Sequence, residues 1–157
     1  STFSIRRYNS PDDTEVLRDL INRSLRGLSG HLHSKVAFDR HERHLRSDAF
    51  ALELDAMSFW VVVDVGNSVR GCGGWAADPS CTAARIREVF VDPDASRCGA
   101  GSLLVSEAII DARLAGFELI WVSSSQYAVP FYESLGFVTN GPPSTDNLPS
   151  VPMVLNS

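Results

Sequence analysis

The sequence is poor in cysteine, and the three cysteines form no recognisable pattern. Cys72, Cys81 and Cys98 are an odd number in a chain of 157 residues, and no two of them lie close together. This spacing argues against a disulfide framework and against a zinc site. Three reduced thiols in a cytosolic protein are the interpretation that fits them.

Long apolar runs are also missing. No stretch approaches the length of a membrane span, and no basic-plus-apolar leader opens the chain. We therefore expect a cytoplasmic protein that has no membrane partner. The sequence also contains no internal repeat.

Positive charge is scarce as well. The net charge is −5, so there is no broad cationic field that would hold nucleic acid, and we expect no nucleic-acid partner. A mildly acidic surface suits a basic substrate such as an amine, although many soluble proteins are equally acidic.

Length and composition fit a single domain over residues 1–157. That length is sufficient for a core of one sheet plus helices. Apolar residues make up 44% of the chain, which is typical of globular rather than disordered proteins.

The N-terminal residues predict a strand followed by a helix. Thr2 to Tyr8 alternates apolar and polar residues, which is typical of a half-buried strand. A helix start follows, with Ser10 as the cap and Pro11 in the first turn. Two glycines interrupt the pattern between residues 24 and 30, where we expect the helix to fray. The expected apolar stripe consists of Val16, Leu17, Leu20 and Ile21.

Residues 30–50 contain all four histidines, namely His31, His33, His41 and His44. His41 and His44 are three residues apart, so they can share one face of a helix. A metal site needs further ligands at a compatible geometry, and none is evident. We predict a polar helix with surface histidines and no bound metal.

The remainder of the chain predicts alternating strands and helices. Residues 58–65 and 69–77 form a hairpin around the turn Gly66-Asn67-Ser68. Gly71, Gly73 and Gly74 weaken its second strand and indicate a bulge or close packing. Further strands are expected at 83–91, 117–123, 136–138 and 151–155, and helices at 102–115, ended by Gly116, and at 129–135. This order predicts a mixed α/β fold, with a partly antiparallel sheet flanked by helices.

The segment from Glu88 to Leu104 reads as strand, glycine loop and helix. The start of a helix leaves backbone N–H groups without partners and carries the positive end of the helix dipole. Glycines allow a ligand to approach that backbone closely, so the loop suits a phosphate or pyrophosphate. It is not the full dinucleotide fingerprint, since Leu104 stands where a third glycine would fall, and the Gly-Lys-Ser/Thr phosphate loop is absent.

A second motif follows the strand Leu119-Ile120-Trp121-Val122 and reads Ala128-Val129-Pro130-Phe131-Tyr132-Glu133-Ser134-Leu135-Gly136-Phe137. It resembles the Ala-x-x-Phe-Tyr-x-x-x-Gly-Phe motif of the GNAT superfamily of acetyl-CoA-dependent N-acyltransferases. The loop Ser96-Arg97-Cys98-Gly99-Ala100-Gly101 resembles the Gln/Arg-x-x-Gly-x-Gly/Ala pyrophosphate loop of the same family. Both motifs come in the family's order and together cover the C-terminal half of the core. The sequence departs from the pattern at Ser96, where Gln or Arg is usual, and at Ser125, where Asn is frequent.

The resemblance implies a GNAT-like fold with a V-shaped gap between the strand that ends at Val91 and the strand that ends at Ser123. Acetyl-CoA would enter this gap, and its pantetheine arm would pair with the backbone of the strand like an added strand. Arg97 would add a charge contact to the phosphates, or it is an ordinary surface arginine. The cofactor-binding residues implied are Val89, Phe90, Val91, Ser96, Arg97, Cys98, Gly99, Ala100, Gly101, Ser102 and Ser125.

Acyl transfer to an amine requires a base, a stabilised oxyanion and a proton donor for the thiolate. Tyr132 matches the family tyrosine that points at the CoA sulfur, and a phenol stays protonated at neutral pH; the alternative is a packing aromatic. The backbone N–H of Val91 is the implied oxyanion contact. Strand alternation places Glu88 opposite Val89 and Val91, which favours Glu88 as the base. Otherwise Glu88 pairs with Arg85 or Arg87, or the base comes from the histidine-rich segment, or no base is needed.

The resemblance implies an acetyl-CoA-dependent N-acetyltransferase that acts on a primary amine of a small molecule or protein. A non-catalytic acyl-CoA-binding regulatory module remains the alternative, because of the departures at Ser96 and Ser125. A toxin-type transferase for aminoacyl-tRNA is a third hypothesis, against which the acidic charge speaks. By analogy, residues 30–46 would select the acceptor, which the sequence does not name. Homodimers are common in this fold, so a homodimer is left open.

Overall fold

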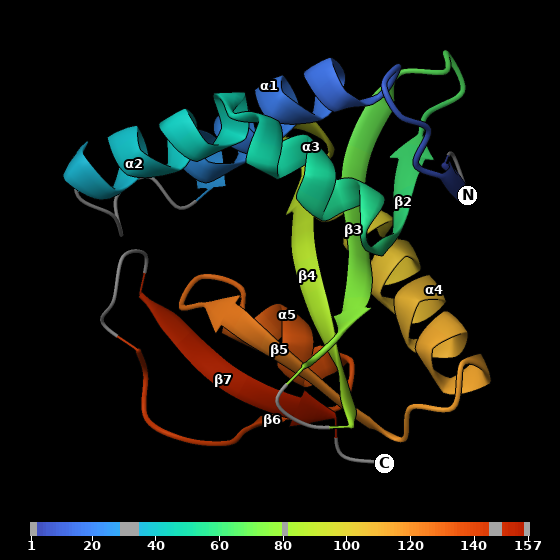
Figure 1. The fold of residues 1–157 in the computed structure, drawn as a ribbon, viewed down its shortest axis with the longest axis vertical. Helices are drawn as coiled ribbons and strands as arrows, with labels where there is room; N and C mark the ends of the chain where they lie inside the picture. Colours follow the sequence, from blue (N-terminus) through green and yellow to red (C-terminus); the bar gives the residue numbers. More distant parts are fainter. Residues whose placement is uncertain (1–2, 29–34, 80–81, 145–148, 156–157) are drawn as a thin grey trace.

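The computed structural model describes residues 3–28, 35–79, 82–144 and 149–155, so Cys81, His31 and His33 lie outside the described residues (Figure 1). Its strands join into one seven-stranded sheet in the order β1-β2-β3-β4-β5-β7-β6. In chain order the elements are β1 (Ser4–Arg7), α1 (Thr14–Leu28), α2 (Lys35–Arg46), α3 (Asp48–Asp55), β2 (Ser58–Val63), β3 (Val69–Ala77), β4 (Ala83–Val91), the 3₁₀ turn η2 (Pro93–Ala95), α4 (Ala100–Leu114), β5 (Leu119–Ser125), α5 (Val129–Ser134), β6 (Phe137–Thr139) and β7 (Ser150–Leu155). The expected mixed α/β sheet flanked by helices is confirmed.

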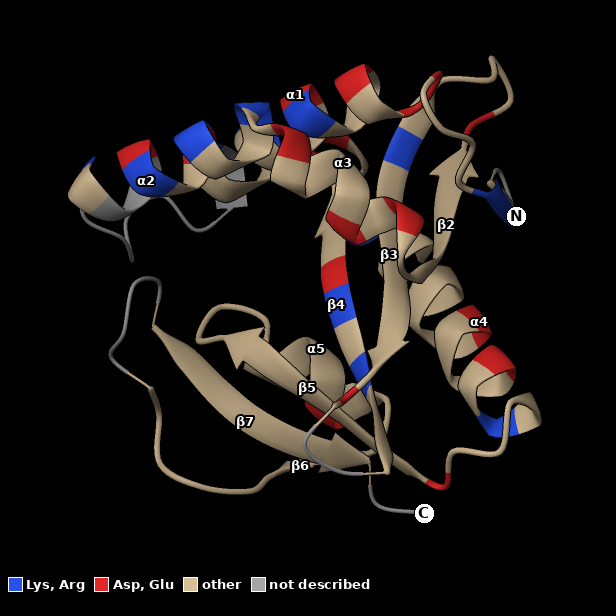
Figure 2. Ribbon diagram, in the orientation of Figure 1, with Lys and Arg blue, Asp and Glu red and all other residues tan. Residues whose placement is uncertain are grey.

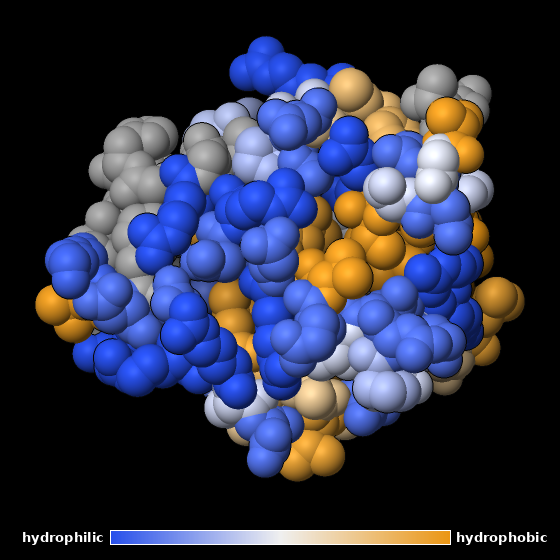
Figure 3. All heavy atoms as spheres, turned by 90° about the horizontal axis from the view of Figure 1, so that it is seen from above, coloured by the Kyte–Doolittle hydropathy of each residue, from blue (hydrophilic) through white to orange (hydrophobic). Residues whose placement is uncertain are grey.

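Helices cover both faces of the sheet (Figure 1), and the side chains of β2 contact the helices on each side. Phe59, Val61 and Val63 pack with the buried leucines of α1 and α3. Trp60 and Val62 point to the opposite face and pack with α4. Because successive strand residues point to opposite faces, one apolar strand serves both cores. Seen from above, the helical layer over α1 to α3 is mostly hydrophilic outside (Figure 3).

The sheet splits between β4 and β5, which are the only parallel neighbours among its described strands. The two strands pair over Ala83–Ile86 and Leu119–Val122. Beyond these residues β4 stays with β3, while β5 continues along β7 as far as Ser125. The strands therefore diverge and open the V-shaped gap that the resemblance implied.

The first helix begins later in the chain than predicted. It begins at Thr14 rather than at Ser10, because Asp13 is tied to the strand before it. The Asp13 carboxylate accepts hydrogen bonds from the Arg6 guanidinium (2.8 and 2.9 Å) and from the Asn9 amide (2.7 Å). At its other end the helix continues to Leu28, within the range 24–30 in which it was expected to fray, and its buried stripe extends to Leu25.

Val16 was wrongly placed in the apolar stripe of this helix. Its side chain is 44% exposed, whereas Leu17, Leu20 and Ile21 are fully buried. The stripe follows the helical period from Leu17 onward, and Val16 falls outside that arc.

From residue 35 onward, the histidine-containing segment forms the polar helix that was predicted, here as α2, and a second helix, α3, that was not. The His44 ring and the Glu53 carboxylate are 2.9 Å apart, which links α2 to α3. The short α3 carries only two buried side chains, Phe50 and Leu54, so its periodic signal in the sequence is weak.

Several further boundaries differ from the prediction, three of them for a visible reason. Strand β2 ends at Val63, because the Asp64 carboxylate accepts the amides of Gly66 and Ser68 and closes the turn. Helix α4 begins at Ala100, directly after Gly99. Strand β5 begins at Leu119, because the Phe117 amide still donates to the Ala112 carbonyl at the end of α4 (3.1 Å). None of the described helices has the length and apolar character that crossing a bilayer requires.

Candidate functional site

A cleft of about 820 Å³ occupies the gap between β4 and β5. Its walls come from α1, α2, both strands, the loop before α4 and the start of α5. Every residue predicted for the site lines it except Cys98, which is exposed, and Ala100, whose side chain is buried. The lining residues include Glu88, Val89, Phe90, Val91, Ser96, Arg97, Gly99, Gly101, Ser102, Ser125 and Tyr132.

One end of the cleft is the loop that leads into α4. Asp92 starts the turn η2 and its side chain accepts the amide of Asp94. Gly99 then adopts a left-handed conformation (φ 89°) that favours glycine, and α4 begins at the next residue. The N–H groups of residues 100–102 are the first of this helix and have no intrahelical acceptors. Together with the helix dipole, they form an anion-binding site beside the cleft.

The two glycines of this loop have different physical roles. A Cβ on Gly99 would meet no atom within 4 Å, so this position is set by backbone conformation. A Cβ on Gly101 would stand 3.1 Å from Phe131 Cζ. Gly101 therefore allows α4 to pack closely against Phe131. The sequence motif alone does not show whether a glycine serves such packing or the approach of a ligand.

Ser96 and Ser125, the two departures from the family pattern, are both engaged with the backbone. The Ser96 hydroxyl donates to the Pro93 carbonyl (3.1 Å). The Ser125 hydroxyl accepts from the Ala128 amide (3.2 Å) and so supports the turn into α5. Both side chains thus stabilise the loops at the two sides of the cleft.

A β-bulge in β4 aims the side chains of the cleft wall. Gly74 lies opposite Arg87, and Cys72 lies opposite Phe90, so two residues of β4 face the single residue Gly73. The bulged residue is Glu88, which has φ 57°, and its carbonyl accepts from the buried Cys72 thiol (3.3 Å). The glycines of β3 predicted a bulge or close packing, and the structure has both. A Cβ on Gly74 would lie 2.1 Å from the Ser58 carbonyl oxygen.

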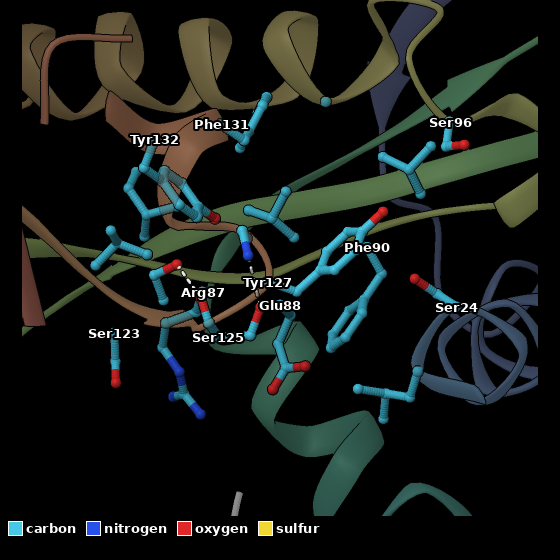
Figure 4. A pocket seen from close by; sticks show the side chains of 18 of the residues that line it. Ser24, Arg87, Glu88, Phe90, Ser96, Ser123, Ser125, Tyr127, Phe131 and Tyr132 are labelled. Carbon is cyan, nitrogen blue, oxygen red and sulfur yellow. Dashed lines mark hydrogen bonds between the residues drawn. The ribbon is translucent and has the colours of Figure 1, made fainter. Parts of the chain in front are cut away.

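The bulge places Val89 and Val91 against the core under α4, while Phe90 packs on the α1 side. Glu88 therefore lies opposite the two valines, as predicted, and its carboxylate points toward α3 (Figure 4). Burial raises the pKa of Glu88, and the Glu53 charge adds to this, although Arg87, His44 and Arg85 oppose it. The alternative to a role as base was an ion pair of Glu88 with Arg85 or Arg87. Among the described side chains, the structure has no such ion pair.

Tyr132 reaches the cleft from α5, on the opposite wall (Figure 4). Its ring packs edge-on against Phe131 and Phe137, with centroids 5.0 and 5.5 Å away. Only 5% of the residue is exposed, and burial raises the pKa of its phenol further above the ordinary value. Tyr132 therefore remains a protonated donor across the physiological pH range.

Several lining residues were not predicted from the sequence. They include Ser24 and Leu25 of α1, Arg85 and Arg87 of β4, and Ser123 and Tyr127 at the end of β5. His41 of α2 also lines the cleft, and it belongs to the segment 30–46 that was expected to select the acceptor. Strand periodicity could have indicated some of them, because residues two apart on a strand point to the same face. Arg85 and Arg87 are two apart on β4, and Ser123 and Ser125 are two apart on β5. Among the described residues, no group of His, Cys, Asp and Glu is suited to hold a metal ion.

Comparison with known proteins agrees with this geometry. The model of the acetyltransferase (GNAT) domain matches residues 55–139. A GCN5-related N-acetyltransferase from Rhodopseudomonas palustris is similar over 100% of this chain and 97% of its own, with a TM-score of 0.83 and 20% identity. The PaiA N-acetyltransferase from Thermoplasma acidophilum, solved in complex with coenzyme A, has the same TM-score at 17% identity and full coverage of both chains.

A third similar structure is part of a larger protein. N-acetylglutamate synthase from Neisseria gonorrhoeae, complexed with coenzyme A and L-arginine, matches 99% of this chain over 33% of its own, with a TM-score of 0.71 and 21% identity. These structures share the fold, and the family match spans more than half of the sequence. The chain belongs to the GNAT family of acetyltransferases.

Proposed function

We propose that this protein is an acetyl-CoA-dependent N-acetyltransferase that moves an acetyl group directly to a primary amine within a ternary complex. The observation that carries this proposal is a single cleft with an anion-binding helix start at one end and a buried phenol, Tyr132, in its wall. A cofactor with a phosphate end and a reactive thioester end matches both features.

Binding of the cofactor would use the backbone on both sides of the loop. The pyrophosphate would accept hydrogen bonds from the N–H groups at the start of α4. Arg97 lies in the same loop, is exposed and has no ion pair with a described carboxylate, so it is available for phosphate. The pantetheine arm would pair with the backbone of Val89 to Val91, where β4 no longer has β5 beside it.

The chemical step uses the two walls of the cleft. The amine nitrogen attacks the thioester carbonyl carbon, the N–C bond forms, and the C–S bond breaks. Tyr132 donates its proton to the departing thiolate, and the second proton that the nitrogen loses after the N–C bond forms returns the phenol to its protonated state, directly or through a water. Glu88, directly or through a water, accepts the proton that the ammonium must lose, and its raised pKa makes it a better base than an exposed carboxylate.

A non-catalytic acyl-CoA-binding regulatory module is the alternative. It would use the same anion site but would not transfer the acyl group. The engagement of the Ser96 and Ser125 side chains with their own loops fits either function, so only turnover separates the two.

The first experiment is a thermal-shift titration with CoA and acetyl-CoA, followed by measurement of CoA release with a panel of amines. A ligand that binds only the folded state adds about 2.7 kcal/mol of stability at a hundredfold excess over its Kd. A shift together with amine-dependent CoA release supports the transferase. A shift without release from any amine supports the module, and the absence of a shift at millimolar ligand rejects acyl-CoA binding itself.

A further inference from the structure

Arg85 and Arg87 of β4 both line the cleft, and neither forms an ion pair with a described carboxylate. Seven other arginines, namely Arg6, Arg7, Arg18, Arg23, Arg26, Arg46 and Arg70, each have an ion pair with an acidic residue. Within the described part of the chain, Arg85 and Arg87 have none, although both line the cleft and are only partly exposed. Partly buried, unpaired cations are costly and therefore call for a binding partner.

Arg85 is held by an aromatic ring instead of an acid. Its guanidinium lies over the Trp121 ring, 4.8 Å from the centroid, and the Trp121 indole donates to the Asp78 carboxylate (3.1 Å). The Nε atom of Arg85 is buried and has no hydrogen-bond partner. Burial lowers the pKa of Arg85, and the nearby Arg87 charge lowers it further, although Asp78 and Glu88 oppose this. An anion bound between the two guanidinium groups would relieve their repulsion.

The bulge in β4 brings this positive charge beside the proposed base. In a regular strand Arg87 and Glu88 would point to opposite faces. Because Glu88 is the bulged residue, both side chains enter the cleft from the same side, and the Ser123 hydroxyl joins them from β5 (Figure 4). Basic and acidic positions stand next to one another on this strand (Figure 2). A ligand with separate positive and negative groups would match this pattern.

We propose that the acceptor is an amine that carries a carboxylate, such as an amino acid, and that Arg87 and Arg85 bind this carboxylate while Glu88 faces the amine. This inference rests on the proposed acetyl transfer. The fork of a guanidinium fits a carboxylate through two parallel hydrogen bonds. A dianionic phosphate would meet stronger repulsion from Glu88, so a monoanion fits better. The net charge of the chain is negative and suits a purely basic amine, but this wall of the cleft carries the two positive charges of Arg85 and Arg87.

The test measures binding rather than turnover, so that its outcome is separate from that of the proposed function. The protein, saturated with CoA, is titrated calorimetrically with N-acetyl amino acids and with the matching N-acetyl amino acid amides. Charged hydrogen bonds of this kind predict that the carboxylates bind at least about tenfold more tightly than the amides. Arg87→Gln should abolish this preference, Arg87→Lys should retain part of it, and Arg85→Gln should reduce it.

Arg113→Gln is the matched control, because it removes the same charge from the exposed end of α4 and should leave the preference unchanged. Melting temperature and CoA binding check that the Arg87 variants are folded. Equal affinity for carboxylates and amides, or no binding of either by the natural protein, overturns the inference whatever the variants do. Failure of every amine to release CoA rejects the transferase instead, and that result does not depend on the carboxylate preference.

Discussion

Gly101 and Phe131 meet where the two halves of the cleft join. A Cβ on Gly101 would stand 3.1 Å from Phe131 Cζ and 3.3 Å from Phe131 Cε1. Gly101 belongs to the first turn of α4, which carries the anion-binding amides, and Phe131 precedes Tyr132 on α5. The contact thus sets the position of the proposed phosphate site relative to the proposed proton donor.

Replacing Gly101 by alanine should therefore weaken CoA binding. The new methyl group forces the ring of Phe131 or the start of α4 to move by a few tenths of an ångström, and overpacking of this kind costs about 1–3 kcal/mol. We expect a lower melting temperature and about a tenfold weaker Kd for CoA. The double variant Gly101→Ala with Phe131→Leu removes the ring and should restore much of the affinity. Unchanged CoA binding in the single variant would show that the contact does not position the loop.

Tyr132→Phe should lower kcat with an amine acceptor by at least about a hundredfold, which is the usual contribution of a positioned general acid. The Kd for CoA should change little, because the ring and its contacts with Phe131 and Phe137 remain. Tyr127→Phe is the matched control, since Tyr127 is another phenol of the cleft wall but is 44% exposed. An equal loss of kcat in both variants would mean that neither phenol is a specific donor.

Local patterns in the sequence were sufficient to predict much of this protein. The glycine loop before α4 and the Phe131-Tyr132 motif both depend on short-range backbone geometry, which residue types report directly. The alternating strands β2, β3 and β4 were recognised because their apolar residues pack on both faces of the sheet. The mixed α/β fold was predicted from the order in which strands and helices alternate along the chain.

The remaining features depend on contacts between residues that are distant in the sequence. The bulge at Glu88 arises from pairing two residues of β4 with Gly73 of β3. The start of α1 at Thr14 depends on the contact of Asp13 with Arg6 of β1. The insertion of β7 between β5 and β6 leaves no local trace. The paired cations Arg85 and Arg87 are visible as a strand pattern, but only the fold shows that no described carboxylate neutralises them.

Glu88→Gln should change how both activity and stability depend on pH. The pKa of Glu88 is raised above its ordinary value of 4.5. The rate of the natural protein should therefore decrease as the pH is lowered, with an inflection at a pH above 4.5. The glutamine variant should be slower at neutral pH and should lose this acid limb from its profile of kcat/KM against pH. A profile that keeps the same inflection in the variant would assign the base to another group.

The stability of the same variant gives an independent check with a defined sign. Because the folded pKa exceeds the unfolded one, the carboxyl group contributes stability below its unfolded pKa, and this is lost as the pH rises through the folded value. Glu88→Gln should therefore be at least as stable as the natural protein at pH 7, measured by urea unfolding. A marked loss of stability at pH 7 would indicate that the charged carboxylate has a structural partner.

The pKa of Asp92 is shifted in the opposite direction from that of Glu88. We therefore expect the charged carboxylate of Asp92 to stabilise the fold. Its side chain is 2% exposed and accepts from Arg23 of α1 (2.8 Å) and from Arg70 of β3 (3.1 Å). Burial alone raises the pKa of Asp92, but the hydrogen bonds from Arg23 and the Asp94 amide, with the charges of both arginines, bring it below the ordinary value of 3.8. This cluster joins three elements at the start of the proposed phosphate loop.

Asp92→Asn should lower the free energy of unfolding at pH 7 by about 1–3 kcal/mol, because two guanidinium groups lose a buried acceptor. Both arginines are partly exposed, at 45% and 32% of their side chains, so solvent reduces the loss toward the lower end of this range. Because the folded pKa is depressed, the stabilisation is present above the unfolded pKa and is lost as the pH falls through the folded one. The difference between the two proteins in urea unfolding should accordingly shrink below pH 3.8. The control Asp94→Asn changes an exposed neighbour, and it should alter the free energy of unfolding by no more than about 0.5 kcal/mol at every pH. If Asp92→Asn has an effect of the same size, the cluster does not stabilise the fold.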